Sequence, residues 1–201
     1  MWISSSKNKP RKVGITGGIG SGKTTACLIF ETLGVPVYYA DTQAKQLMNT
    51  DPELKASITE YFGNNIYCDG ILDRKKLAEI VFNDKIALEK LNSWVHPAVA
   101  RDFELWYSRQ ISNYVLEEAA IIYESGIADR FDKVILVTAP DEIRIERVCA
   151  RDGVTPDIVQ KRMKNQWSED KKIALADYII RNDNDNLLIR QVIDIHEILQ
   201  Q

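Results

Sequence analysis

A glycine-rich segment has the residue types and the spacing that bind phosphate. It reads Gly17-Gly18-Ile19-Gly20-Ser21-Gly22-Lys23-Thr24, which fits the pattern Gly-x-x-x-x-Gly-Lys-Ser/Thr. Glycines let successive backbone N–H groups turn towards an anion without obstruction from a Cβ atom. A lysine supplies a mobile positive charge for the β- and γ-phosphates, and a threonine hydroxyl suits Mg²⁺. The segment therefore predicts a triphosphate site built from Gly18, Gly20, Ser21, Gly22, Lys23, Thr24 and Thr25, with Thr24 as the Mg²⁺ ligand.

The residues on either side of this loop agree with that prediction. Residues 12–16 favour a β-strand, and residues 25–34 favour a helix that ends at Gly34. The start of such a helix adds unpaired N–H donors and the positive end of its dipole. A dinucleotide-binding loop would need a third glycine at position 23, where lysine stands. The order strand, loop, helix therefore predicts a phosphate-binding loop.

Length and composition indicate a single globular α/β protein. The chain has 201 residues, of which 45% are hydrophobic and 27% charged, and its net charge is −3. These values fit one domain with an inserted subdomain and give no general attraction to nucleic acid. The basic residues Lys7, Lys9, Arg11 and Lys12 form a local cluster near the terminus that is read as solvated, and residues 1–11 are read as a polar arm. We expect no nucleic-acid partner.

The cysteines and the hydropathy pattern suggest a setting for the protein. Cys27, Cys68 and Cys149 are scattered, without the spacing of a disulfide framework or a zinc site. The sequence shows neither an apolar run of membrane length nor a signal-peptide core. We therefore expect a cytoplasmic protein with no membrane partner.

Apolar segments and acidic residues alternate in a way that predicts a parallel sheet. Strands are expected at residues 12–16, 35–40, 114–123, 133–138 and 178–180, with helices between them. Asp41 and Glu124 follow two of these strands. Because ligands of such sheets bind beyond the carboxyl ends of the strands, we expect both carboxylates near the phosphate loop. Asp41 is favoured as a catalytic base over a helix N-cap. Glu124 is expected to order Mg²⁺ through water or to contact substrate, or else is only a charged strand end.

Two helical blocks interrupt the predicted sheet. Residues 42–111 form a helical insertion, broken at His96-Pro97, that we expect to bind substrate. The core is then residues 12–41 and 112–201. From about 144 to 172, a basic helix-turn-helix suits a lid over ATP phosphates, with Arg147 and Arg151 as nucleotide ligands. Arg144 and Arg162 fit the lid or a solvated face equally. His96 fits a substrate contact or a structural histidine equally.

Several motifs together resemble the dephospho-CoA kinase family, from Val13 to about Asn182. They are Gly14 to Thr25, Ala40-Asp41, Gly70-Ile71-Leu72-Asp73-Arg74 with Leu77, Val81-Phe82, His96-Pro97, Tyr123-Glu124, Arg147 with Arg151-Asp152, Gln166, and Ala176 to Ile180 with Asn182. The resemblance implies a P-loop kinase-like, five-stranded parallel sheet flanked by helices, with a helical CoA-binding insertion and a helical lid. It also implies that ATP phosphorylates the ribose 3′-hydroxyl of dephospho-CoA, the last step of coenzyme A biosynthesis.

The same resemblance implies roles for individual residues. Asp41 takes the position of the catalytic base, Arg74 and His96 lie near the acceptor, and Arg147 lies near the nucleotide. The sequence departs from the family pattern at Tyr39, where an aspartate is frequent, and at residues 119–122, where a Val-Pro-Leu-Leu run is usual.

Other functions remain as alternatives. A GTP-hydrolysing switch is disfavoured because no Asn-Lys-x-Asp segment is present. Another P-loop small-molecule or nucleotide kinase shares the expected fold but lacks this insertion. A non-catalytic nucleotide-binding regulator is the alternative outside enzymes, although Lys23, Thr24 and Asp41 are all present. A monomer or weak homo-oligomer is expected.

Overall fold

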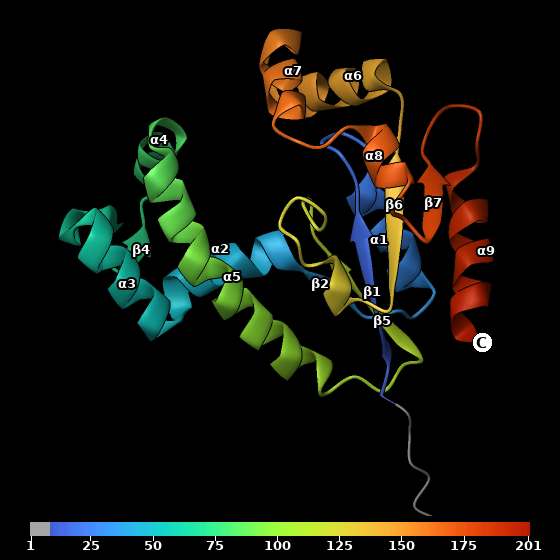
Figure 1. Ribbon diagram of the computed structural model, residues 1–201, viewed down its shortest axis with the longest axis horizontal. Helices are drawn as coiled ribbons and strands as arrows, with labels where there is room; N and C mark the ends of the chain where they lie inside the picture. Colours follow the sequence, from blue (N-terminus) through green and yellow to red (C-terminus); the bar gives the residue numbers. More distant parts are fainter. Residues whose placement is uncertain (1–8) are drawn as a thin grey trace, which may run out of the picture. The chain divides into compact units, whose positions relative to one another are not determined.

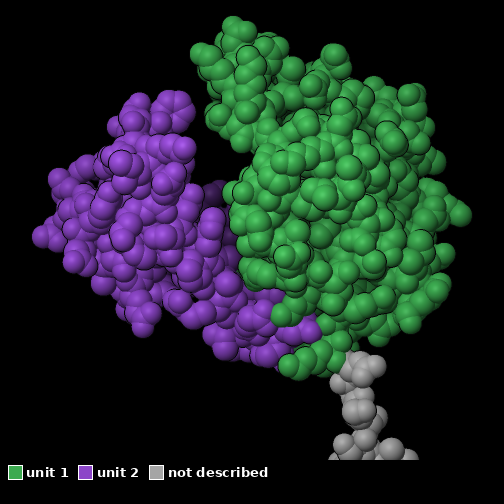
Figure 2. Space-filling model, in the orientation of Figure 1, with its two compact units in different colours: residues 1–39, 110–201 green, residues 40–109 purple. Residues whose placement is uncertain are grey.

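The computed structural model describes residues 9–201 and divides into two compact units. Unit 1 holds the residues up to Tyr39 together with Gln110–Gln201, and unit 2 holds Ala40–Arg109 (Figure 2). The sequence places the helical insertion at residues 42–111. Residues 1–8 of the predicted polar arm lie outside the described residues, and Arg11 already begins the first strand.

Unit 1 is built on a parallel sheet with the strand order β2-β5-β1-β6-β7, which confirms the predicted five-stranded sheet (Figure 1). Neighbouring strands pair in parallel throughout, for example Ile15 with Glu118 on one side and with Ile135 on the other. The strands are β1 (Arg11–Thr16), β2 (Val37–Tyr39), β5 (Tyr114–Glu118), β6 (Lys133–Thr138) and β7 (Tyr178–Arg181).

Helices α1 and α9 pack together on one face of this sheet (Figure 1). Their apolar residues, among them Phe30 and Leu199, meet alternate strand residues such as Ile15 and Val137, all fully buried. This core fixes the loop that joins β1 to α1. The helices of unit 1 are α1 (Lys23–Thr32), α6 (Asp141–Asp152), α7 (Pro156–Lys164), α8 (Glu169–Ile173) and α9 (Leu188–Gln200), with a 3-10 turn η2 (Ala128–Arg130).

The expected strand from 114 to 123 is too long. β5 ends at Glu118, and the Ala119 N–H makes the last ladder bond to the Ile15 carbonyl at 3.1 Å. In the neighbouring strand β1, only Thr16 follows Ile15, which pairs with Glu118. No β1 residue therefore remains to pair with a longer β5. Ile122 is buried outside the sheet. Glu118, not Glu124, therefore stands at the carboxyl end of this strand.

Unit 2 is mainly helical, and aspartates begin three of its four helices. Asp51, Asp73 and Asp84 each accept a hydrogen bond from a backbone N–H three residues later, at 2.9–3.0 Å. The elements are α2 (Ala40–Thr50), α3 (Pro52–Phe62), a 3-10 turn η1 (Asn64–Ile66), an antiparallel pair β3 (Tyr67–Cys68) and β4 (Ile71–Leu72), α4 (Arg74–Asn83) and α5 (Lys85–Tyr107).

The predicted break at His96-Pro97 is wrong, because α5 continues through Pro97 to Tyr107. A proline inside a helix costs about 3 kcal/mol, since it removes one hydrogen bond and crowds the preceding turn. Buried residues before and after it, including Val95 and Val99, hold both halves of α5 in the core of unit 2. Burial of such side chains contributes about 1.5–3 kcal/mol each, which outweighs the cost.

Candidate active site

The phosphate loop lies in unit 1, between Thr16 at the end of β1 and Lys23 at the start of α1. Gly22 has a φ of +90°, and a Cβ atom there would lie 2.0 Å from Nδ2 of Asn182. That amide, just after β7, donates to the Ser21 carbonyl at 2.8 Å. Only glycine fits both the backbone conformation and this close approach.

Lys23 points into the loop. Its Nζ donates to the Gly17 carbonyl at 2.9 Å and lies 3.9 Å from Oε1 of Glu118. Both side chains are largely buried, with exposed fractions of 11% and 10%. An ammonium group is a mobile charge with three donor hydrogens. The Lys23 ammonium group thus lies at Gly17, the first residue of the loop that would surround a phosphate.

A cavity of about 350 Å³ opens beside the loop and the start of α1. It gathers all the predicted nucleotide ligands except Gly18 and Ser21. The start of α1 and the two arginines make its charge positive, as a polyphosphate requires. Its lining residues are Gly20, Gly22, Lys23, Thr24, Thr25, Arg147, Val148 and Arg151.

The arginines of the predicted lid differ in their surroundings. Arg151 Nε and Arg162 Nη1 bind the two oxygens of Asp152 at 2.7 and 2.9 Å, which joins α6 to α7. The hydrogen bond from Arg151 is the main cause that lowers the pKa of Asp152. Arg144 is only 3% exposed, which contradicts the solvated face, and from α6 it donates to the Ile19 carbonyl of the phosphate loop.

The oxygen donors near the loop fit a nucleotide-bound Mg²⁺ ion. Mg²⁺ is commonly held by one or two protein ligands, with phosphates and waters completing its shell. The Thr24 hydroxyl lines the cavity, and the Glu118 carboxylate lies beside Lys23. The Ser21 hydroxyl is buried and has no hydrogen-bond partner in residues 9–201. Within that same range, no group of three or more His, Cys, Asp or Glu side chains could hold a metal by itself.

Glu118 is the site residue that the sequence reasoning missed. The apolar run after it made Glu124 look like the strand end. Two adjacent carboxylates, Glu117 and Glu118, in an otherwise apolar strand were the available signal. Their side chains alternate across the sheet. Glu117 is 3.5 Å from Arg130, whereas Glu118 is on the side of Lys23.

Glu124 lies in the connection after β5, where one ion pair and one hydrogen bond hold its carboxylate. Its Oε1 is 3.0 Å from Nζ of Lys172 and accepts from the Trp167 N–H at 3.0 Å. Lys172 is fully buried. The other oxygen of Glu124, Oε2, is buried without a hydrogen-bond partner in the described part of the chain. Its predicted substrate contact thus stays a prediction, with one carboxylate oxygen available for it.

We expect Lys172→Met to lower the free energy of unfolding by about 3–5 kcal/mol, because it leaves the Glu124 carboxylate buried without its cation. Urea denaturation followed by circular dichroism measures this change. Lys171→Met is the matched control. Lys171 is exposed and lies over the Trp167 ring, a contact of about 0.5–1 kcal/mol. Equal losses in the two variants would contradict a buried ion pair that stabilises the fold.

In unit 2, Asp41 lies in the first turn of α2. The helix begins one residue earlier, at Ala40, so Asp41 is not the N-cap that was its alternative role. Its carboxylate is exposed and makes no hydrogen bond or ion pair with residues 9–201. A negative charge in the first turn is favoured by the helix dipole. Asp41 is therefore an accessible carboxylate in the first turn of α2.

Arg74 and His96 are the other two acceptor-side candidates in unit 2. Nη2 of Arg74 donates to the Lys45 carbonyl at 3.3 Å. Lys45 lies four residues after Asp41, so Arg74 contacts α2 about one helical turn from Asp41. His96 projects from the middle of α5. Desolvation lowers the pKa of His96, which keeps the ring uncharged at neutral pH.

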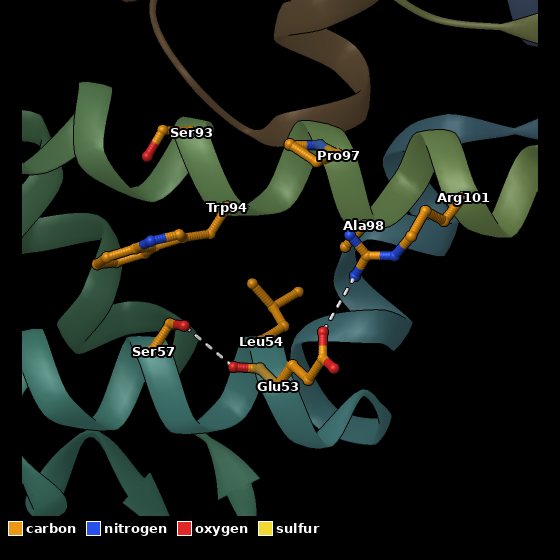
Figure 3. A pocket seen from close by; sticks show the side chains of 8 residues that line it. All are labelled: Glu53, Leu54, Ser57, Ser93, Trp94, Pro97, Ala98 and Arg101. Carbon is orange, nitrogen blue, oxygen red and sulfur yellow. Dashed lines mark hydrogen bonds and ion pairs between the residues drawn. The ribbon is translucent and has the colours of Figure 1, made fainter.

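Unit 2 also holds a cavity of about 160 Å³ between α3 and α5 (Figure 3). Arg101 lies at one side of it, 3.7 Å from Glu53 and 3.8 Å from Asp51. None of the predicted acceptor residues lines this cavity. Its lining residues are Glu53, Leu54, Ser57, Ser93, Trp94, Pro97, Ala98 and Arg101.

The departure at Tyr39 also has a structural account. Tyr39 ends β2, and its hydroxyl donates to Oε2 of Glu31 on α1 at 3.1 Å. The side chain thus ties the edge strand to the helix that follows the phosphate loop.

Among residues 9–201, no helix has both the length and the apolar character needed to cross a membrane.

Comparison with known proteins identifies the family. The family model for dephospho-CoA kinase matches residues 11–187. The dephospho-CoA kinase of Porphyromonas gingivalis is 41% identical over 186 residues, which cover 92% of each chain. A crystal structure from Thermus thermophilus has a TM-score of 0.85 at 32% identity, covering 96% of this chain and all of that one. The dephospho-CoA kinase structure from Campylobacter jejuni has a TM-score of 0.68 at 26% identity, over 94% and 96% of the two chains. The chain is therefore a kinase that belongs to the dephospho-CoA kinase family.

Proposed function

We propose that this protein transfers the γ-phosphoryl group of ATP to the 3′-hydroxyl of the ribose of dephospho-CoA, giving coenzyme A and ADP. The observation that carries the proposal is the cavity in which Lys23 and Thr24 meet Arg147 and Arg151, in a chain of this family. Phosphoryl transfer needs alignment and charge neutralisation more than covalent help from the protein. The cavity supplies both.

On the donor side, the loop N–H groups and Lys23 hold the β- and γ-phosphates, and Arg147 and Arg151 bind the nucleotide from α6. Thr24 and Glu118 would hold a Mg²⁺ ion, which would supply charge neutralisation on the phosphates. Each of these groups favours the charge that spreads over the phosphate oxygens in the transition state. Lys23 therefore has a catalytic role besides binding.

On the acceptor side, Asp41 accepts the proton of the 3′-hydroxyl. The freed oxygen forms a bond to the γ-phosphorus, and the bond from that phosphorus to the bridging oxygen breaks, so ADP leaves. Arg74, His96 and Glu124 bind the acceptor. Arg74 suits an anionic group, and a neutral His96 suits a hydroxyl or amide. The exposure of Asp41 and the reach of Arg74 to α2 support this assignment.

We expect ADP release to depend on the acceptor. The protein is mixed with ATP and Mg²⁺ and with dephospho-CoA, AMP, shikimate or no acceptor, and ADP is measured by a coupled assay. Phosphorus NMR then locates the new phosphate. Rapid ADP formation with dephospho-CoA and a 3′-phosphate product is the expected result. Turnover with AMP or shikimate instead would identify another P-loop kinase, and ATP binding without any turnover would identify a nucleotide-binding regulator.

The proposed setting is the cytoplasm, and the proposed state is a monomer or weak homo-oligomer with ATP and dephospho-CoA as partners. Cys27, Cys68 and Cys149 are free thiols, which suits a reducing compartment.

A further inference from the structure

The peptide groups on both sides of Ile19, in the middle of the phosphate loop, are held by two side chains that lie far away in the sequence. The Ile19 N–H donates to Oε1 of Gln166 at 2.9 Å. The Ile19 carbonyl accepts from Nε of Arg144 at 3.0 Å. Arg144 lies in α6, and Gln166 lies between α7 and α8. Ile19, Arg144 and Gln166 all belong to unit 1.

These two bonds set the orientation of two consecutive peptide planes. Because a trans peptide is planar, its N–H and C=O point in opposite directions. The Ile19 N–H faces Gln166, so the Gly18 carbonyl faces the other way and accepts from the Ser21 N–H at 3.1 Å. The Ile19 carbonyl faces the Arg144 guanidinium, so the Gly20 N–H points away from that guanidinium. Gly20 lines the nucleotide cavity, and its N–H has no partner within residues 9–201.

Two carboxylates hold the buried guanidinium of Arg144. Its Nη1 lies 3.1 Å from Oδ1 of Asp141 and 3.2 Å from Oε1 of Glu169. The other oxygen of Glu169 accepts from the Thr138 hydroxyl at 2.6 Å, at the end of β6. A Cβ atom on Gly18 would lie 2.1 Å from Nη2 of Arg144, so glycine is required for the guanidinium to lie against the loop. The Arg144 guanidinium is therefore held between the two carboxylates and the loop.

Gln166 is fixed through the residue that follows it. The Trp167 N–H donates to Oε1 of Glu124, which pairs with the buried Lys172. The backbone at residues 166 and 167 is thus attached to the loop on one side and to the connection after β5 on the other. The backbone beside Gln166 is therefore held in place, and its side-chain amide lies against Ile19.

We propose that Gln166 and Arg144 are positioning residues of the phosphate loop, which hold the Ile19 peptides so that the Gly20 N–H is directed towards a bound phosphate. This deepens the proposed function and rests on it for ATP as the ligand of the loop. Donors that are oriented before the ligand arrives need no reorganisation when charge develops. Loss of one such bond is expected to weaken ATP binding by about tenfold.

The test compares Gln166→Leu with Gln160→Leu in the full-length protein. Gln160 is an exposed glutamine of α7 and serves as the matched control. We expect Gln166→Leu to raise the Kd and the KM for ATP about tenfold, with the KM for dephospho-CoA within about twofold. Amide hydrogen exchange at Ile19, followed by NMR, is expected to become faster in Gln166→Leu and to remain slow in the control.

A second variant, Gln166→Glu, keeps an acceptor oxygen for the Ile19 N–H, so that amide is expected to stay protected from exchange. Equal ATP affinity and equal Ile19 protection in Gln166→Leu and Gln160→Leu would overturn the proposal. An equal rise in the KM for both substrates would also overturn it, because it would indicate general damage. ATP affinity is measured without an acceptor, so failure of dephospho-CoA phosphorylation in the wild-type protein leaves this test intact.

Discussion

Asp41→Asn is expected to lower kcat by about 10²-fold or more, while ATP affinity stays within about twofold. An amide cannot take the proton of the attacking hydroxyl at neutral pH. Asp41 is exposed and makes no bond with residues 9–201, so the substitution removes no structural contact. The lost interaction with the helix dipole is about 0.3–1 kcal/mol, too little to unfold α2. Steady-state kinetics with dephospho-CoA and equilibrium titration with ATP measure the two quantities.

The matched control for this substitution is Glu79→Gln. Glu79 is an exposed carboxylate on α4 in the same unit, and its side chain makes no bond with residues 9–201. Its replacement is expected to leave kcat within about twofold. Near-normal turnover of Asp41→Asn would remove Asp41 from the role of base. A parallel loss of ATP affinity would assign it to nucleotide binding instead.

The phosphate loop could be predicted from the sequence because its chemistry is contiguous. The strand before it, the glycines within it and the helix after it occupy residues 11–32 without interruption. Local backbone requirements can be predicted from the residue type, because a left-handed conformation such as that of Gly22 favours glycine. The same holds for the aspartates that cap the helices of unit 2.

The end of β5 and the path of α5 could not be predicted in this way. An apolar run gives no information on where its ladder partner ends, and here the partner β1 ends at Thr16. The local preference of Pro97 favours a break, and only tertiary burial of Val95 and Val99 overrides it. Strand ends and helix interruptions depend on such distant neighbours.

The contacts around Ile19 lie even further from what a sequence reveals. Gln166 and Arg144 reach the loop across 147 and 125 residues, through side chains whose types are common on surfaces. In the sequence, Arg144, Arg147 and Arg151 all belong to the basic segment that predicts a lid. The fold instead buries Arg144 and leaves Arg147 and Arg151 on the cavity.

Lys23→Met is expected to lower kcat/KM for ATP by about 10²–10³-fold, the range found when one group that stabilises developing charge is removed. Methionine keeps an unbranched apolar side chain of similar length in a position that is largely buried. The thermal midpoint is nevertheless expected to fall by several degrees, because Glu118 is left largely buried without its neighbouring cation. Initial rates at varied ATP and differential scanning fluorimetry measure the two effects.

Lys85→Met provides the control for this substitution, because Lys85 is 88% exposed on α5 and, within residues 9–201, pairs only with solvent-exposed Glu89. Its kcat/KM is expected to match the wild-type value. Lys23→Arg adds a sharper test, since arginine keeps the charge but carries it on a planar fork that does not reproduce a compact ammonium. A large loss in Lys23→Arg would show that the position of the charge matters as well as its sign. Unchanged kinetics in Lys23→Met would mean that the loop binds no reacting phosphate, and the proposed donor site would then be wrong.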